Sequence, residues 1–109
     1  MLNLVEGYTE EMTSLRRSIH AKPETGWTEF RTTAVIVEHL KALGYHVCQG
    51  LEVINPEFVM GRDEEEVKAA QKRAHAEGVS QEELAAMQGY TGALAVLDTG
   101  RPGTVTALR

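Results

Sequence analysis

The chain has 109 residues and therefore forms one domain at most. Its 16 acidic and 11 basic side chains give a net charge of −5, which argues against a nucleic-acid partner because few Lys and Arg are available to neutralise phosphates. A single cysteine, Cys48, permits no internal disulfide, and residues 1–12 lack the features of a signal peptide or a membrane helix. We therefore expect a cytoplasmic protein with no membrane partner.

Two amphipathic helices are predicted at the start of the chain. In the first, over 4–19, apolar side chains recur at helical spacing on one stripe. These residues are Leu4, Tyr8, Met12, Leu15 and Ile19. The helix should end before Pro23, which lacks a backbone donor and turns the chain at a corner. The second helix is predicted over 28–43, with Gly44 at its carboxyl-terminal cap.

A strand is predicted after the second helix. Residues 45–54 have the aromatic and β-branched content of a strand, and Gly50 within them indicates a bulge or the strand's end. Residues 55–89 then break this pattern and are predicted to be a helical insert.

Two helices are predicted inside the insert because two residue pairs have the spacing of a capping box. The pairs are Asp63 with Glu66 and Ser80 with Glu83. The inward-facing positions of the first of these helices are small residues, namely Val67, Ala70 and Ala74. We therefore expect this helix to bury little apolar area and to lie on the surface.

Two further strands are predicted near the end of the chain. Residues 93–97 and 105–108 are apolar runs that flank a Gly/Pro-rich turn at 98–103, which favours an antiparallel pair. The order helix, helix, strand, helical insert, strand, strand favours an α/β sheet with helices packed on it. The last apolar run reaches Arg109 without a turn or cap, so the sequence resembles a truncated domain. In open α/β sheets the reactive groups lie just beyond the strand ends, which here would be after Arg109.

Four histidines are the first candidates for a metal site. They are His20, His39, His46 and His75. Each falls on a different predicted element and no pair forms a short ligand motif, which argues against a metal site built from these residues alone. His20 has the best functional case, at a helix end that favours its cation and near Glu24, but a capping or structural role is the favoured interpretation.

The other reactive side chains have local structural explanations. Arg16 and Arg17 approach a helix carboxyl terminus, where positive charge is favourable. Glu24 and Glu29 could form a catalytic carboxylate pair, but nothing in the pattern indicates a cleft, and a place in a helix's first turn accounts for Glu29. Cys48 lies in a predicted strand without a neighbouring basic motif and is interpreted as an inert thiol. The Gly-Arg-Pro-Gly segment lacks the ending of a phosphate loop and is interpreted as a turn.

Several stretches, in order, resemble the amino-terminal part of the metal-dependent amidohydrolases of the aminoacylase and carboxypeptidase family. "LRRSIHAKPETGWTEFRT" resembles the family's opening Arg-Arg-x-x-His-x-x-Pro-Glu segment, although Ser18 and Lys22 replace an acid and a second histidine that are common there. "HLKALGY" resembles the end of the family's second helix, and "YTGALAVLDTGRPGTVTALR" resembles the strands and turn that follow. The insert and "LDTGRPG" are most similar to the branch that acts on aminobenzoyl-glutamate.

The resemblance implies that residues 1–109 are the N-terminal fragment of a layered α/β/α metallopeptidase-like catalytic domain. It also implies a hydrolase that cleaves the amide bond of an N-acyl amino acid with a divalent metal, zinc or manganese, which activates a water. In this family the metal ligands and the catalytic glutamate follow the Ala-Leu-Arg strand, so they would lie beyond Arg109.

We therefore assign no catalytic, cofactor-binding or metal-binding residue, and we expect the isolated chain to bind no metal and to be inactive. Assembly into a homo- or hetero-oligomer stays open. The alternative is a non-catalytic binding or assembly module that docks on a partner through an exposed sheet edge.

Overall fold

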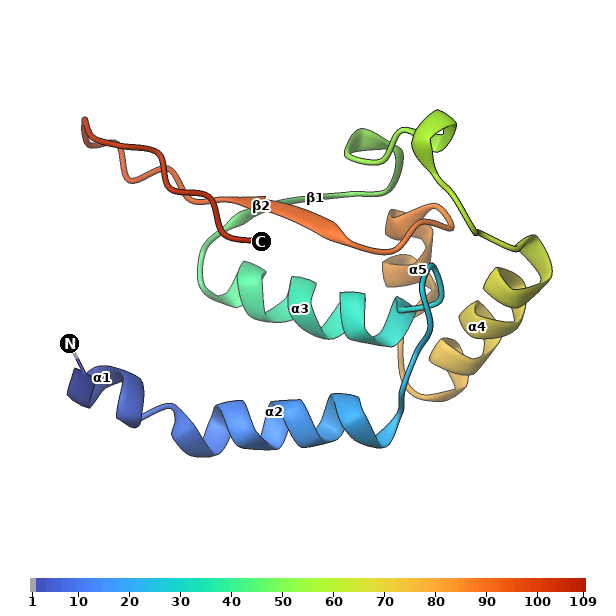
Figure 1. The fold of residues 1–109 in the computed structure, drawn as a ribbon, viewed down its shortest axis with the longest axis horizontal. Coiled ribbons are helices and arrows are strands. Elements are labelled where there is room, and N and C mark those ends of the chain that lie inside the picture. Colours follow the sequence, from blue (N-terminus) through green and yellow to red (C-terminus); the bar gives the residue numbers. More distant parts are fainter. Residues whose placement is uncertain (1) are drawn as a thin grey trace.

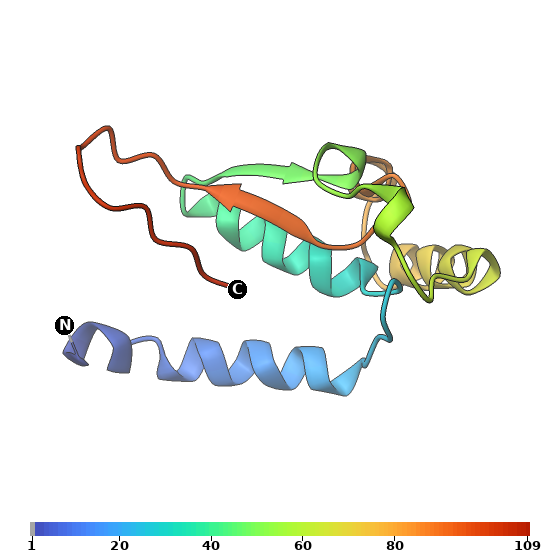
Figure 2. The ribbon, with the colours of Figure 1, turned by 45° about the horizontal axis from the view of Figure 1, so that its top comes forward.

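The computed structural model describes residues 2–109 and consists of helices packed against one small antiparallel sheet (Figure 1). The helices are α1 (Leu2–Glu6), α2 (Thr9–Ala21), α3 (Phe30–Ala42), α4 (Glu64–Ala76) and α5 (Gln81–Met87), with short 3₁₀ helices η1 (Gly50–Glu52) and η2 (Pro56–Phe58). The strands are β1 (His46–Gln49) and β2 (Ala93–Val96). The sheet lies along α3. Helices α4 and α5 pack near the start of α3, and α2 runs beside α3 on the side away from the sheet (Figures 1 and 2). The predicted mixture of helices and strands is thereby confirmed.

The predicted helix over 4–19 is in fact two helices. Helix α1 ends at Glu6, and α2 begins at Thr9 after Gly7 and Tyr8. Glycine is a poor residue inside a helix because it has the most backbone freedom to lose, and here the Thr9 hydroxyl donates to the Glu6 carbonyl oxygen at 2.8 Å across the break. Helix α2 then continues to Ala21, so its end before Pro23 is confirmed.

The carboxyl-terminal end of α3 is the one predicted. Gly44 follows the helix with φ of 85°, a left-handed conformation that glycine adopts without strain. The Gly44 amide donates to the Lys41 carbonyl at 3.0 Å, and the Tyr45 amide donates to the Leu40 carbonyl at 3.0 Å. This pair of hydrogen bonds is a Schellman motif, which ends the helix and directs the chain into β1.

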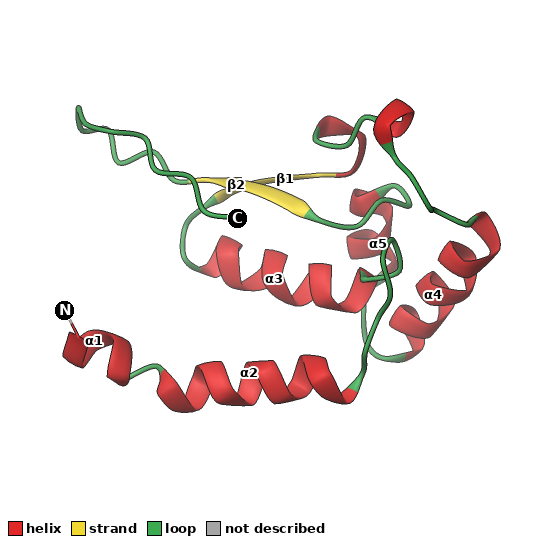
Figure 3. Cartoon of the chain, in the orientation of Figure 1, coloured by secondary structure: helices red, strands yellow, loops and turns green. Residues whose placement is uncertain are grey.

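The sheet has a different strand pairing from the predicted one. Strand β1 pairs with β2 in antiparallel register, with Val47 opposite Ala95. The prediction of a strand at 105–108 is wrong: these residues are irregular and Val105 is 93% exposed. An apolar run becomes a strand only where another strand pairs with it, and within residues 2–109 the chain after β2 turns back without such a partner (Figure 3). Gly50 does end a strand, as predicted, because β1 stops at Gln49.

The buried core lies between α3, α4 and α5. It consists of Phe30, Ala34, Val67, Ala70, Ala74, Val79, Leu84 and Met87. Phe30 and Met87 are its largest fully buried side chains. Val67, Ala70 and Ala74 are the inward-facing residues of α4, as predicted, and are at most 2% exposed. Most other residues of α4 are exposed, so the prediction of a surface helix is confirmed. Because these three side chains are small, α4 packs closely against the core through a narrow face.

Both helices of the insert begin where the capping residues predict. The Asp63 carboxylate accepts the backbone amides of Glu65 and Glu66, each at 2.9 Å, at the start of α4. Ser80 and Glu83 form the full reciprocal capping box at the start of α5.

Candidate functional site

The corner between α2 and α3 is organised by Glu24. Its carboxylate accepts hydrogen bonds from the backbone amide of Arg31 at 3.0 Å, and from the amide and hydroxyl of Thr32 at 2.9 and 2.6 Å. These amides belong to the first turn of α3, where backbone donors have no partner inside the helix and where the helix dipole favours an anion. Glu24 is therefore a capping residue for α3 rather than a partner of His20.

We expect Glu24→Ala to destabilise the chain by about 1–3 kcal/mol, because it removes three hydrogen bonds to a charged acceptor at a partly buried helix start. Urea denaturation followed by circular dichroism measures this loss. Glu38→Ala is the matched control, since Glu38 is exposed on the same helix. Equal stabilities of the two variants would show that the Glu24 cap does not stabilise α3.

Glu29 connects the start of α3 to the start of β2. The Thr91 hydroxyl donates to the Glu29 carboxylate at 2.8 Å, and the Gly92 amide donates to the Thr33 hydroxyl at 3.1 Å. Thr33 and Thr91 are both buried, so these hydrogen bonds satisfy polar groups that water reaches poorly. The sequence placed Glu29 correctly near the helix start, but it gave no signal for this contact with a residue 62 positions away.

An aromatic cluster packs where the corner meets the insert. The Trp27 indole donates to the Met60 carbonyl at 2.8 Å and packs edge-on against Tyr90 with ring centroids 6.2 Å apart. The Arg62 guanidinium lies 4.5 Å from the centre of the Tyr90 ring and donates to the Gly89 carbonyl at 2.8 Å. The cluster joins three loops that are distant in sequence, through the Trp27 indole and the Arg62 guanidinium.

The four histidines lie on four different elements, α2, α3, β1 and α4. His20 is in the last turn of α2 and His46 is the first residue of β1. The Nδ1 atoms of His39 and His75 each lie 2.8 Å from a backbone carbonyl, those of Val35 and Val79. Within residues 2–109, no three His, Cys, Asp or Glu side chains are grouped so that they could bind a metal. The residues present therefore do not fit the metal centre that the family resemblance implies.

Cys48 lies half-buried in β1 and has an unreactive environment. Hydrogen bonding to the Glu52 carboxylate, partial burial and the negative charge of Glu52 together raise the pKa of the Cys48 thiol. Since the thiolate is the nucleophile, a raised pKa lowers reactivity at neutral pH, which agrees with the interpretation of an inert thiol.

We expect Glu52→Gln to accelerate alkylation of Cys48 by iodoacetamide several-fold at pH 8. The substitution removes the negative charge, so the pKa of Cys48 falls and the thiolate fraction rises. Timed quenching and mass spectrometry give the rate, with Glu57→Gln as a control at a carboxylate that does not contribute to the raised pKa of Cys48. An unchanged rate in Glu52→Gln would refute this cause of the raised pKa.

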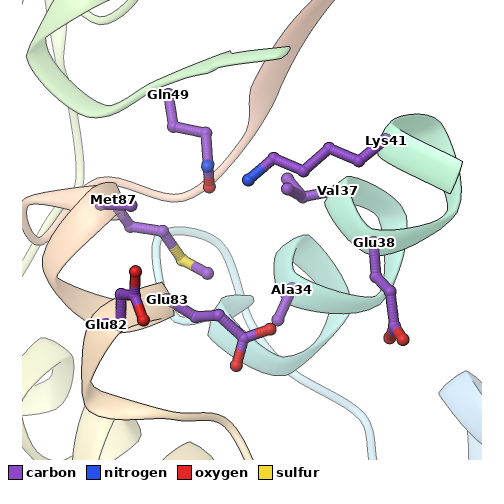
Figure 4. Close-up of a pocket in the computed structure, with 9 residues that line it drawn as sticks. Ala34, Val37, Glu38, Lys41, Gln49, Glu82, Glu83 and Met87 are labelled. Carbon is purple, nitrogen blue, oxygen red and sulfur yellow. The ribbon is translucent and has the colours of Figure 1, made fainter. Parts of the chain in front are cut away.

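A cavity of about 300 Å³ opens between α3, α5 and the end of β1 (Figure 4). It is lined by Ala34, Val37, Glu38, Lys41, Gln49, Glu82, Glu83, Ala86 and Met87. The Lys41 side chain extends toward Gln49, whereas Glu38 points away from it (Figure 4). The ionisable residues of its lining are Glu38, Lys41, Glu82 and Glu83, and no His, Cys, Ser or Thr is among the nine lining residues. Among the helices that the structure describes, none has the length and apolar character to cross a membrane.

The chain is homologous to hydrolases that are named for amino acid conjugates. No protein-family model matches it. It is 40% identical over 107 residues to a p-aminobenzoyl-glutamate hydrolase subunit of Escherichia coli, and the match covers 96% of this chain and 24% of that protein. It is 42% identical over 101 residues to indole-3-acetyl-aspartic acid hydrolase of Enterobacter agglomerans, with 91% of this chain and 23% of that protein covered.

A solved structure is similar to this chain in both sequence and fold. The crystal structure of an aminobenzoyl-glutamate utilization protein from Klebsiella pneumoniae matches 93% of this chain with a TM-score of 0.86 and 39% identity. The match covers 26% of that protein. The chain therefore spans about a quarter of the length of the relatives it matches.

Proposed function

We propose that this chain is part of the catalytic domain of a metal-dependent amidohydrolase that cleaves the amide bond of an N-acyl amino acid. The observation that carries the proposal is identity of about 40% along nearly the whole chain to proteins named as hydrolases of aminobenzoyl-glutamate and of indole-3-acetyl-aspartate. The names of these relatives describe an aromatic acyl group joined to glutamate or aspartate. An aromatic amide of an acidic amino acid, with aminobenzoyl-glutamate as the first candidate, is the substrate class we propose.

Within such an enzyme, the residues of this chain would form a structural scaffold and would not take part in the chemistry. Glu24 caps α3, and the hydrogen bonds of Glu29 and Thr33 attach the start of β2 to α3. These contacts hold the start of α3 and the point where the chain enters β2. We propose that the zinc or manganese ligands and the proton-transferring group lie in the part of the enzyme that this chain does not span. A layered α/β/α domain, a cytoplasmic location and assembly with a second polypeptide belong to the same proposal.

A chimera tests this function directly. In the Escherichia coli hydrolase subunit, the matched residues are replaced by the 107 corresponding residues of this chain, and the rest of that subunit is kept. This full-length chimera is co-expressed with any further subunit of the same enzyme. We expect hydrolysis of p-aminobenzoyl-glutamate, measured as released glutamate, with indole-3-acetyl-aspartate as the comparison substrate. A chimera that folds and assembles but releases glutamate no faster than the isolated chain would contradict the proposal.

A further inference from the structure

The cavity between α3, α5 and the end of β1 has an apolar floor. Ala34, Val37 and Met87 form this floor and belong to the buried part of the molecule, while Ala86 forms part of the wall. The Met87 side chain points toward the middle of the cavity (Figure 4). A volume of about 300 Å³ is at the small end for ligand sites, so the cavity suits a compound with a single ring.

Two hydrogen-bond donors lie together on one side of the cavity. The Lys41 side chain, in the last turn of α3, extends toward the Gln49 side chain at the end of β1 (Figure 4). Within residues 2–109, Lys41 takes part in none of the ion pairs. An ammonium group and an amide N–H are both donors to a carboxylate, and the charged one makes the stronger hydrogen bond. This side of the cavity therefore favours a carboxylate.

Carboxylates lie on the opposite side of the cavity. They belong to Glu82 and Glu83 in the first turn of α5 (Figure 4). Glu83 accepts one hydrogen bond, from the Ser80 amide at 2.8 Å, and a carboxylate can accept several, so it retains acceptor capacity. With Glu38, the lining has three glutamates and one lysine and thus a net charge of −2. A ligand with two carboxylates would be repelled, whereas a donor group would be bound.

We propose that this cavity binds a small aromatic acid with one carboxylate and, at the opposite end of the ring, one amino group. The carboxylate accepts hydrogen bonds from Lys41 and Gln49, and the amino group donates to Glu82 or Glu83. The ring packs on the apolar floor at Val37.

The particular ligand that we propose is p-aminobenzoate. This choice rests on the proposed function, because hydrolysis of the amide bond of p-aminobenzoyl-glutamate, after which one relative is named, releases this acid and glutamate. Glutamate itself does not fit the cavity, since it carries two carboxylates and has no apolar body to cover the floor. The site thus distinguishes the two products of the proposed reaction.

Acetylation of Lys41 reports occupancy of the cavity directly. The full-length chimera and the isolated chain are each treated with a trace of acetylating reagent, with and without saturating p-aminobenzoate, and mass spectrometry gives the extent at each lysine. Lys72 is the internal reference, since it is exposed on α4 and reports any reagent that the aromatic amine consumes. We expect p-aminobenzoate to slow acetylation of Lys41 relative to Lys72 by about threefold or more. Glutamate at the same concentration should leave the ratio unchanged.

Two results would overturn the site. One is an unchanged ratio of Lys41 to Lys72 acetylation with p-aminobenzoate, and the other is equal protection by glutamate. An unchanged ratio in a chimera that hydrolyses p-aminobenzoyl-glutamate would overturn the site and leave the proposed function standing. Protection of Lys41 in a chimera without hydrolysis would support the site and contradict the proposed function.

Substitution of the two glutamates tests the orientation of the ligand. Gln also serves at the third position of a capping box, so Glu82→Gln combined with Glu83→Gln keeps the start of α5. In equilibrium dialysis with the chimera, we expect this double variant to bind p-aminobenzoate about threefold more weakly, because the amino group loses charged acceptors. Benzoate, which lacks the amino group, should bind no more weakly than before, and Lys72→Gln should change neither ligand's binding. Equal weakening of both ligands in the double variant would refute the contact between the amino group and α5.

Discussion

Phe30→Ala is expected to destabilise the chain by about 3–5 kcal/mol, a large part of the roughly 5–15 kcal/mol that stabilises a typical domain. Phe30 is 0% exposed and packs in the core with Met87 and the small residues of α4. Truncation to alanine loses the burial of the ring and leaves a cavity that the surrounding helices fill only partly. Urea unfolding followed by circular dichroism at 222 nm gives the difference from the unsubstituted chain.

Phe58→Ala is the matched control for this experiment. Phe58 is 80% exposed in η2, so its truncation should change the free energy of unfolding by less than about 0.5 kcal/mol. Equal effects of the two substitutions would show that the helices α3, α4 and α5 do not form the core described above.

The second large effect is expected at Gly50, which directly follows β1. Its φ of 61° is left-handed, and a Cβ there would lie 2.9 Å from the Ala86 carbonyl oxygen and 2.6 Å from Gln88 Oε1. Gly50→Ala should therefore destabilise the chain by about 2–4 kcal/mol, from backbone strain and from steric overlap with α5. Thermal unfolding measures this difference.

Gly44→Ala separates the two causes. Gly44 also has a positive φ, of 85°, but a Cβ there would meet nothing within 4 Å. Only backbone strain remains, so the expected cost is about 1 kcal/mol. If Gly50→Ala cost no more than Gly44→Ala, the close approach of η1 to α5 would be refuted.

Helix boundaries were the most predictable part of the fold, because their determinants are local. Ser80 and Glu83 satisfy each other's backbone groups at the start of α5, and Gly44 ends α3 through a conformation that few other residues adopt. The break after Glu6 was missed because the apolar spacing continues across Gly7.

Burial and strand pairing were less predictable, because they depend on contacts between distant residues. The spacing of the small residues of α4 predicts which of them face inward, but it does not show that they pack against Phe30 and Met87. Residues 105–108 have the composition of a strand, but composition does not specify a partner, and β2 pairs with β1 instead. The contact between Glu29 and Thr91 also depends on how distant parts of the chain pack, so no local sequence pattern predicts it.

The elements that carry the polar residues were largely predictable from the sequence, but their hydrogen-bond partners were not. The four histidines lie on different elements, as the sequence predicts, and two of them, His39 and His75, have backbone partners that the sequence did not indicate. Glu24 was considered as a possible catalytic group, but its three hydrogen bonds to the start of α3 assign it a structural role. The polar residues of the segment 15–32 thus form a scaffold between two helices.

Metal content tests most directly the claim that this chain is scaffold for chemistry performed elsewhere in the enzyme. Elemental analysis after mild chelation is carried out on the isolated chain and on the full-length chimera. We expect no stoichiometric zinc or manganese in the isolated chain, because its histidines and carboxylates are not grouped within residues 2–109, and bound divalent metal in the chimera. One or two tightly bound ions per isolated chain would contradict this claim.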